Sequence, residues 1–135
     1  MGGYELRKYL DKQYEAGGRG PDSFDCYGLA SVVYEEKNGV ALPELWTPES
    51  MEKKHELFTE MKDSQFQVLE EPRSWCLIAF SIRRPFVTHI GVVLDDRSHF
   101  IHILKHRRVT IERFDMDLWR RKIEGFYEPV INSHN

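Results

Sequence analysis

The stretch SFDCYGLASVVYEE, residues 23–36, predicts a helix with a cysteine at its start. Asp25 is a residue type that caps helix N-termini, and the apolar residues after it recur at spacings of three and four. Gly39 supplies a stop signal beyond the last apolar position. We therefore expect a helix from about residue 25 to residue 37, with Cys26 in its first turn. A thiol at that place is either a small buried core group or a nucleophile.

Two further segments have helical periodicity, and the second half of the chain has strand patterns. The segments YELRKYLDKQYE, residues 4–15, and SMEKKHELFTEMKDS, residues 50–64, each place apolar residues on one helical face. After Pro72 short apolar or alternating runs predict strands, within residues 75–82, 86–94, 99–104 and 108–114. The segment DLWRRKIEGFYEP, residues 117–129, predicts a short helical turn and an edge strand before a polar tail.

Helices followed by strands indicate an α+β fold, with N-terminal helices packed on a small antiparallel β-sheet. The length of 135 residues suits a single domain, residues 1–135, and the 41% of hydrophobic residues suit a packed core. The formal net charge of -3 does not favour nucleic acid as a partner. The basic run at residues 105–108 is interpreted as a solvated strand end.

The N-terminus and the cysteines predict where the chain is made. MGGYELRKYL has neither the apolar run of a signal peptide nor the residue that myristoylation needs at position 6, where Leu6 stands. Cys26 and Cys76 then read as reduced thiols rather than a disulfide, and Cys76 lies in an apolar run that suits a core thiol. We expect a chain that is cytoplasmic as synthesised and that has no membrane partner.

Two histidines are predicted to share one face of a hairpin. A turn centred between Asp96 and Arg97 sets the register of the strands on either side. Because side chains alternate between faces, His89 and His102 become diagonal neighbours within about 8 Å at their Cβ atoms, and Gly91 leaves space beside them. The register pairs Leu94 with His99, Val93 with Phe100, Gly91 with His102, and His89 with Leu104.

The histidine pair has three interpretations. It can be two core histidines with satisfied hydrogen bonds, or part of a metal site with Cys26, His89 and His102 as ligands, although a fourth ligand with suitable spacing is missing. It can also be a Cys-His-His catalytic site, in which one imidazole takes the thiol proton and the other group orients that imidazole. Lowering a thiol pKa from about 8.5 to about 6 needs roughly 3.4 kcal/mol. A helix N-terminus supplies at most about 2 kcal/mol, so a charged His89 is expected to supply the rest.

The chain resembles the NlpC-type papain-like cysteine peptidases of bacterial cell walls, particularly small members associated with phage tails. The resemblance rests on YEAGGRGPDSFDCYGLASVVYEEKNGVALPEL, THIGVVLDD, HFIHI and WRRKIEGFYEP, in the order of the family. It implies a papain-like fold, with Cys26 as the nucleophile, His89 as the general base and His102 as the residue that orients the base. Tyr14 is similar to a family tyrosine on the cysteine side of the site, and Asp25 is expected to cap the helix and to act electrostatically.

The resemblance also implies a function. Family members hydrolyse the D-glutamyl-diaminopimelate or D-glutamyl-lysine bond of peptidoglycan stem peptides, without a cofactor or metal, so the expected partners are the stem peptide and other phage tail proteins. The expected locations are the cytoplasm, where the chain is synthesised, and a virion tail. The alternative is a weakly active or inactive structural tail-tip protein with the same fold. A papain-like acyltransferase is a third interpretation, which needs an apolar channel that the sequence does not reveal. Ser74-Trp75 replaces the Gly-Asp turn of the family.

Overall fold

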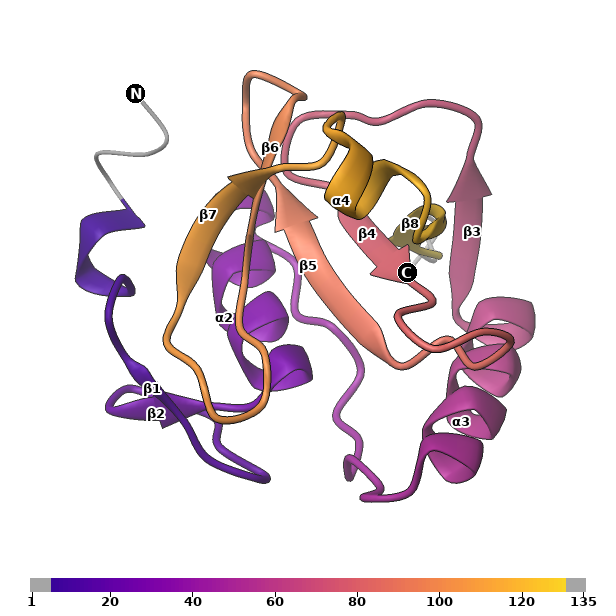
Figure 1. The fold of residues 1–135 in the computed structure, drawn as a ribbon, viewed down its shortest axis with the longest axis horizontal. Helices are drawn as coiled ribbons and strands as arrows, with labels where there is room; N and C mark the ends of the chain where they lie inside the picture. Colours follow the sequence, from indigo (N-terminus) through magenta and orange to yellow (C-terminus); the bar gives the residue numbers. More distant parts are fainter. Residues whose placement is uncertain (1–5, 131–135) are drawn as a thin grey trace.

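The structure is a computed structural model, and it describes residues 6–130. Its larger sheet has six antiparallel strands in the order β3-β8-β4-β5-β6-β7 (Figure 1). A smaller sheet pairs two short parallel strands, β1 (Gln13–Tyr14) and β2 (Ser23–Phe24). The strands of the larger sheet are β3 (Phe66–Leu69), β4 (Leu77–Phe80), β5 (His89–Val93), β6 (His99–His102), β7 (Thr110–Arg113) and β8 (Ile123–Pro129).

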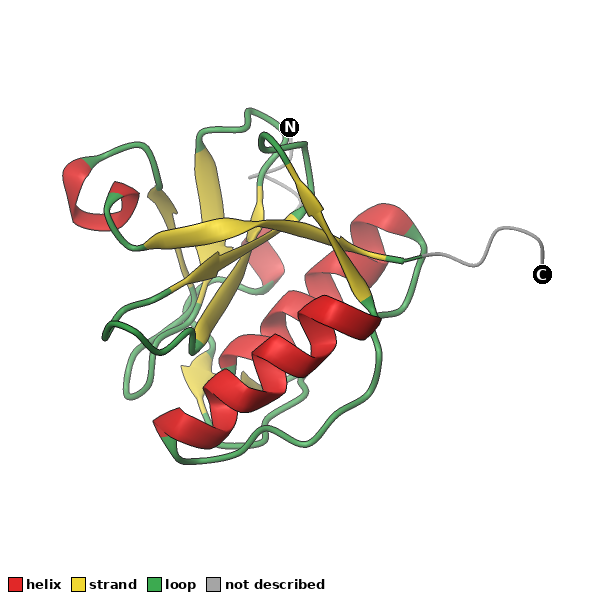
Figure 2. Cartoon of the chain, turned by 90° about the vertical axis from the view of Figure 1, so that its right-hand side faces the viewer, coloured by secondary structure: helices red, strands yellow, loops and turns green. Residues whose placement is uncertain are grey.

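The two faces of the sheet have different covers. Helices α2 (Cys26–Asn38) and α3 (Met51–Ser64) lie on one side, and the short helix α4 (Asp117–Arg120) lies on the other (Figure 2). The first side holds a core of α2 residues packed on alternate strand residues, among them Leu29, Val33, Val92 and Ile101. The second side holds a separate aromatic cluster, which includes Phe80, Phe100, Phe114 and Trp119. This arrangement confirms the predicted α+β fold class.

The predicted helix that begins with the cysteine is confirmed. Asp25 is its N-cap, and its side chain accepts a hydrogen bond from the Gly28 amide at 2.7 Å. Gly39 is the C-cap at φ 72°, in the left-handed region that glycine tolerates. The second predicted helix is confirmed as α3, which begins after Ser50, whose hydroxyl accepts from the Lys53 amide at 3.2 Å.

The prediction of a helix over residues 4–15 is wrong. Its first two residues lie outside the described chain, and the described part contains only a 3₁₀ helix, Leu6–Lys8, followed by the strand β1. Leu6 and Tyr9 are buried in the main core, and their spacing of three residues suits the three-residue turn of a 3₁₀ helix. Asp11 then adopts φ 70°, which interrupts any helix before β1. The apolar spacing therefore reflected core packing rather than an α-helix.

The prediction that the last strand lies at the edge of the sheet is also wrong. The helical turn is present as α4, but β8 lies between β3 and β4, and the edges are β3 and β7. Strand β3 follows directly after α3 and pairs with β8 from Phe66 opposite Pro129 to Leu69 opposite Phe126. The short alternating run of β3 was not recognised in the sequence because it continues from the helix without a turn signal.

The altered turn at Ser74-Trp75 keeps the hairpin that it precedes. Trp75 adopts φ 66°, a left-handed conformation, and its amide donates to the Val93 carbonyl at 2.8 Å. The Asn38 side chain donates to the Trp75 carbonyl at 3.0 Å, which helps to hold this strained residue. Val93 is the last residue of β5, whereas His89 is the first. The departure from the family pattern thus lies at the opposite end of the strand from the catalytic candidate.

Candidate active site

The register of the hairpin brings the two histidines into direct contact. Val92 lies opposite Ile101 and Val93 opposite Phe100, which confirms the predicted pairing. His89 Nε2 and His102 Nδ1 are 2.8 Å apart, a hydrogen-bond distance. Both rings are buried, with exposed fractions of 5% and 1%. The cost of burying these polar groups is therefore offset by hydrogen bonds.

The hydrogen-bonded chain continues beyond His102 to a glutamate. His102 Nε2 lies 2.7 Å from Glu112 Oε2, and Trp119 Nε1 donates to Glu112 Oε1 at 3.0 Å. A carboxylate only accepts hydrogen bonds, so His102 carries its proton on Nε2 and accepts at Nδ1. His89 must then donate from Nε2, which leaves its Nδ1 unprotonated. The relay Glu112–His102–His89 thus prepares His89 Nδ1 to accept a proton.

The prediction that Gly91 leaves open space beside the histidines is wrong. A Cβ atom at this position would lie 2.8 Å from the Ile101 carbonyl oxygen, 3.0 Å from the Phe100 ring and 3.2 Å from His102 Cβ. The first distance is shorter than real Cβ contacts, and the other two are tight enough that the neighbouring side chains would have to shift. The strand next to the histidines is therefore packed, and Gly91 is needed because its neighbours approach closely.

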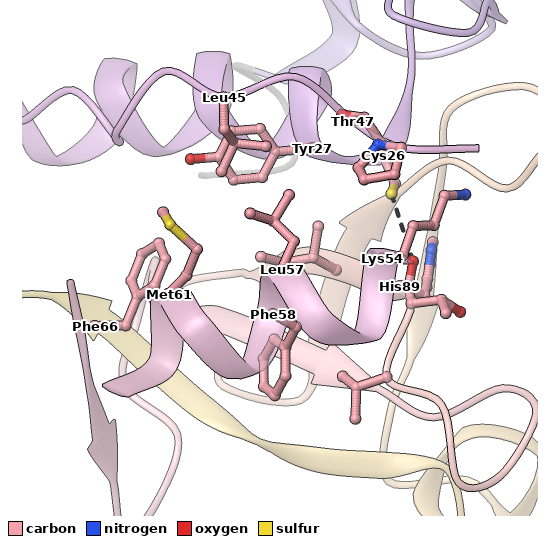
Figure 3. Close-up of a pocket in the computed structure, with 14 residues that line it drawn as sticks. Cys26, Tyr27, Leu45, Thr47, Lys54, Leu57, Phe58, Met61, Phe66 and His89 are labelled. Carbon is pink, nitrogen blue, oxygen red and sulfur yellow. Dashed lines mark hydrogen bonds between the residues drawn. The ribbon is translucent and has the colours of Figure 1, made fainter. Parts of the chain in front are cut away.

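Cys26 lies across a pocket from the relay. The pocket is lined by both Cys26 and His89, which come from the start of α2 and the start of β5 (Figure 3). The thiol donates a hydrogen bond to the Thr88 carbonyl, with Sγ 4.0 Å from the oxygen. The structure thus brings His89 and His102 into contact and places Cys26 beside the residue that precedes His89.

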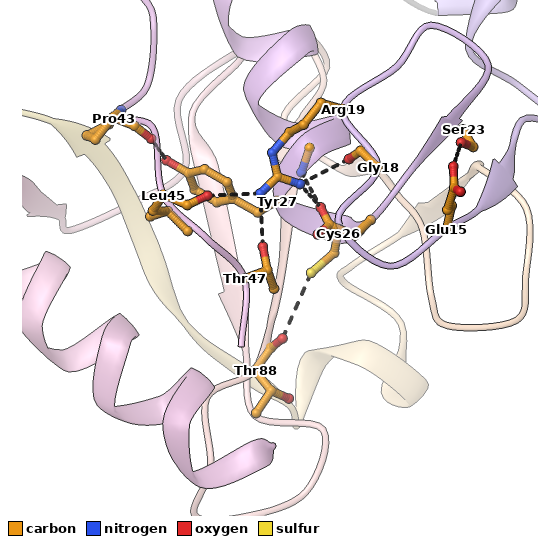
Figure 4. Close-up of polar contacts among 12 residues, drawn as sticks. Glu15, Gly18, Arg19, Ser23, Cys26, Tyr27, Pro43, Leu45, Thr47 and Thr88 are labelled. Carbon is orange, nitrogen blue, oxygen red and sulfur yellow. Dashed lines mark hydrogen bonds and ion pairs between the residues drawn. The ribbon is translucent and has the colours of Figure 1, made fainter. Parts of the chain in front are cut away.

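An arginine that the sequence analysis did not select supports the start of α2. Arg19 Nη1 forms an ion pair with Asp25 Oδ1 at 2.7 Å, and Arg19 Nη2 donates to Leu45 O at 3.0 Å and Thr47 Oγ1 at 3.1 Å (Figure 4). Leu45 and Thr47 belong to the loop that forms one wall of the pocket. Arg19 therefore ties this wall to the helix cap next to Cys26. The other Asp25 oxygen, Oδ2, is buried and has no hydrogen-bond partner among the described residues.

Electrostatics favour an uncharged resting site, in contrast to the thiolate with a charged histidine that was expected from the sequence. Burial raises the pKa of Cys26, and the negative charge of Asp25 raises it further. Burial lowers the pKa of His89 well below its usual value, and His102 and Lys54 lower it further. Burial also lowers the pKa of His102, although Glu112 opposes that effect. Both directions favour a neutral thiol and a neutral imidazole at neutral pH.

Two other side chains have electrostatic effects at the site. Lys54 of α3 lines the pocket, and its charge lowers the pKa of both Cys26 and His89. It forms no recorded ion pair within residues 6–130. Tyr14 lies on β1, where burial raises the pKa of its hydroxyl, as do the charges of Cys26 and Asp25. The tyrosine is therefore close enough to the cysteine side of the site to interact with it electrostatically.

The metal interpretation is not supported by the geometry. In the part of the chain that the structure describes, no group of three or more His, Cys, Asp or Glu side chains is placed to hold a metal ion. His102 uses both of its ring nitrogens, one toward His89 and one toward Glu112, so it has no nitrogen free for a metal.

Within residues 6–130, no helix is long and apolar enough to cross a membrane.

A protein-family model matches the part of the chain that contains this helix, hairpin and relay. The NlpC/P60 family model matches residues 11–128, which is most of the chain. The chain belongs to the NlpC/P60 family. The matched region contains all of the candidate residues: Tyr14, Asp25, Cys26, His89 and His102.

Solved structures of other proteins share the NlpC/P60 fold. A Staphylococcus aureus protein, described as similar to a lipoprotein of the NLP/P60 family, is 26% identical at a TM-score of 0.63, over 96% of this chain and 40% of that one. The NlpC/p60 domain of the peptidoglycan hydrolase SagA is 18% identical at a TM-score of 0.58, over 92% of each chain. NlpC2 from Trichomonas vaginalis is 18% identical at a TM-score of 0.64, over 93% of this chain and 45% of that one. These similarities confirm the papain-like fold predicted for this NlpC/P60 domain.

Curated relatives match a shorter stretch. The probable endopeptidase p60 of Listeria welshimeri is 49% identical over 39 residues, which are 29% of this chain and 7% of that protein. The probable endopeptidase p60 of Listeria innocua is 46% identical over 39 residues, or 8% of its length. The matched stretch of this NlpC/P60 domain therefore covers less than a tenth of the length of these relatives.

Sequence reasoning missed Glu112, although a signal for it was present. The register of β6 and β7 places Phe100 opposite Glu112 and His102 opposite Thr110. Extending the predicted alternation by one strand would have put the glutamate on the same face as both histidines, diagonal to His102. The links from Arg19 to Leu45 and Thr47, and the approach of Lys54 to the site, gave no such signal in this NlpC/P60 sequence, because only the tertiary fold brings these segments together.

Proposed function

We propose that this chain is a cysteine peptidase that hydrolyses the D-glutamyl-diaminopimelate or D-glutamyl-lysine bond of peptidoglycan stem peptides. The observation that carries the proposal is the relay from Glu112 through His102 to His89, which leaves His89 Nδ1 unprotonated, and His89 lines the pocket that Cys26 also lines. Family membership supports the proposal, and so do the names of similar proteins, a peptidoglycan hydrolase and the probable p60 endopeptidases.

The proposed reaction begins with a turn of the thiol from the Thr88 carbonyl toward His89 Nδ1. The hydrogen bond to that carbonyl spans 4.0 Å, so the thiol gives up a weak contact. His89 takes the proton while Sγ attacks the amide carbonyl, and His89 then returns the proton to the leaving amine. Water hydrolyses the acyl-enzyme, with His89 again as the base. The backbone amides of Tyr27 and Ile90, which act to lower the pKa of Cys26, are positioned to stabilise negative charge near Sγ.

Digestion of purified peptidoglycan, followed by mass analysis of the products, tests this proposal. Cys26→Ser is expected to abolish product formation and to leave the thermal midpoint nearly unchanged. Cys76→Ser is the matched control, because Cys76 is a buried thiol directly before β4 and its pKa is raised to about 11, mainly by burial. Wild-type protein that releases no stem-peptide product would instead favour the alternative, an inactive structural protein with the same fold.

The two histidines are expected to differ in their effect on this reaction. His89→Ala removes the base, whereas His102→Ala removes the group that orients it, so His89→Ala should reduce kcat/KM more. Steady-state kinetics on a stem tripeptide would measure both losses. A larger loss for His102→Ala would show that the two roles are exchanged.

Association with a phage tail is a further part of the proposal, based on the resemblance of the sequence to small tail-associated members of the family. Mass spectrometry of purified virions from a host that carries the gene would detect the chain if it is a tail component. Its recovery only from host cytoplasm would contradict this part and leave the chemistry unaffected.

A further inference from the structure

The pocket beside Cys26 has an apolar character that a polar stem peptide does not explain. Most of its wall is formed by apolar side chains of α3, β3 and the loop before α3 (Figure 3). Glutamate, lysine and diaminopimelate have aliphatic stems, but their side chains end in charged groups that an apolar wall does not bind. The apolar wall is formed mainly by Leu45, Leu57, Phe58, Met61 and Phe66.

Leu57 shows that part of this wall is available to a ligand. Leu45, Phe58 and Phe66 pack partly against the main core, whereas Leu57 is not part of either core cluster and is only partly buried. Its side chain nevertheless faces the pocket. An apolar group placed against Leu57 would remove apolar surface from water, which is favourable in proportion to the area covered.

The position of the nucleophile determines how such a group must be attached. Cys26 and His89 line the same pocket as Leu57, with Lys54 between the catalytic end and the apolar end on the surface of α3. When the scissile carbonyl of a substrate reaches Cys26, only a group attached close to that carbonyl can therefore extend into the apolar part of the pocket. We propose that the apolar part of the pocket is a subsite for a substrate side chain. The enzyme would then also cleave amides in which the residue bearing the scissile carbonyl has an unbranched apolar side chain.

The inference rests on the proposed function for its chemistry. Sγ of Cys26 forms a thioester with the carbonyl carbon, the C–N bond breaks, and the amine leaves with the proton that His89 took from the thiol. Water then attacks the thioester, the C–S bond breaks, and the thiol recovers its proton through His89. The sum is amide plus water giving acid plus amine, and it requires no other reactant.

The test separates binding from catalysis. Cys26→Ser protein would be titrated with the N-acetyl amides of alanine, 2-aminobutyrate, norvaline and norleucine, which add one methylene at a time, and NMR shifts would give the dissociation constants. Each buried methylene is expected to lower the dissociation constant by about fourfold. The same order is expected for kcat/KM of wild-type protein on the matching 4-nitroanilides.

Two matched substitutions locate the subsite. In the Cys26→Ser background, Leu57→Asn should flatten the dependence on chain length. Leu118→Asn is the same change at a side chain that is 63% exposed on α4, across the sheet, and it should leave the dependence intact. Constants that do not change with chain length, no shift even with the norleucine amide, or equal effects of the two substitutions would each overturn the inference.

The outcomes also distinguish this inference from the proposed function. Chain-length-dependent binding by Cys26→Ser, together with a wild-type protein that cleaves neither stem peptide nor anilide, would support side-chain binding in the pocket and would contradict both the peptidase proposal and the cleavage of apolar amides. Cleavage of stem peptide without any effect of chain length would support the peptidase proposal and contradict the subsite.

Discussion

The substitution Glu112→Gln should impair catalysis although it changes few atoms. Trp119 Nε1 can only donate a hydrogen bond, and it donates to Glu112 Oε1 at 3.0 Å. In the variant the amide oxygen of Gln will therefore face Trp119, and the amide nitrogen will face His102. His102 must then accept at Nε2 and donate from Nδ1, so that His89 accepts at Nε2 and carries its proton on Nδ1. The base becomes a donor toward the thiol.

The size of the effect follows from the cost of restoring the correct tautomer. Turning the amide around would leave the buried Trp119 donor without a partner, which costs about 1–3 kcal/mol. The active arrangement would then be populated to about one part in 5 to one part in 150. We expect kcat/KM on a stem tripeptide to fall by about the same factor. The free energy of unfolding, measured in urea, should change by less than about 1 kcal/mol because every hydrogen bond of the relay is kept in reversed direction.

A second substitution provides the decisive control. Trp119→Phe removes the donor that fixes the amide, so Glu112→Gln should reduce activity much less in the Trp119→Phe background than in wild-type protein. Nitrogen chemical shifts of the two histidines would report the tautomers directly, and Glu128→Gln, at a surface glutamate paired with Arg73, is a neutral comparison. Full activity of Glu112→Gln, or an equal loss in both backgrounds, would refute the tautomer argument.

Two further substitutions test the electrostatics and the packing of the site. Lys54 lowers the pKa of both His89 and Cys26. Lys54→Met should therefore raise both pKa values and move the acid and basic limbs of the pH profile of kcat/KM to higher pH. Lys53→Met, at the exposed neighbouring lysine, is the control, and a profile that does not move in Lys54→Met would contradict the assignment. Gly91→Ala should lower the free energy of unfolding in urea by about 1–3 kcal/mol, because its Cβ would lie 2.8 Å from a backbone oxygen; an unchanged urea midpoint would show that the strands can separate without cost.

The parts of the fold that the sequence predicted depend on local chemistry. The capping carboxylate of Asp25, the apolar spacing after it and the glycine at position 39 all lie within one segment, and they specify α2 without help from the rest of the chain. The hairpin register depended on one turn, and alternation then placed His89 and His102 on a common face. Both predictions used contacts between residues that are close in sequence.

The parts that the sequence did not predict depend on contacts between distant segments. Tyr9 is buried against Phe24 of β2, with ring centroids 6.2 Å apart, and this packing gave residues 4–15 a helix-like spacing without a helix. Lys54 approaches Cys26 because α3 lies beside the start of α2, and that placement is not encoded within either helix. The predicted Cys26 thiolate is not favoured for the same reason, since burial by other segments raises the pKa of Cys26.

Burial disfavours protonation of the two histidines, and the bond from His102 to Glu112 opposes this effect. A neutral His89 in an apolar site resists taking a proton, because burial and Lys54 both lower its pKa. In the proposed attack, however, the charge that would form on His89 is adjacent to His102, whose other nitrogen is bonded to the Glu112 carboxylate at 2.7 Å. In a site of low dielectric constant that negative charge stabilises the imidazolium strongly, and it does so only once the proton has moved. Glu112 therefore makes a buried, neutral histidine useful as a base while leaving Cys26 protonated at rest.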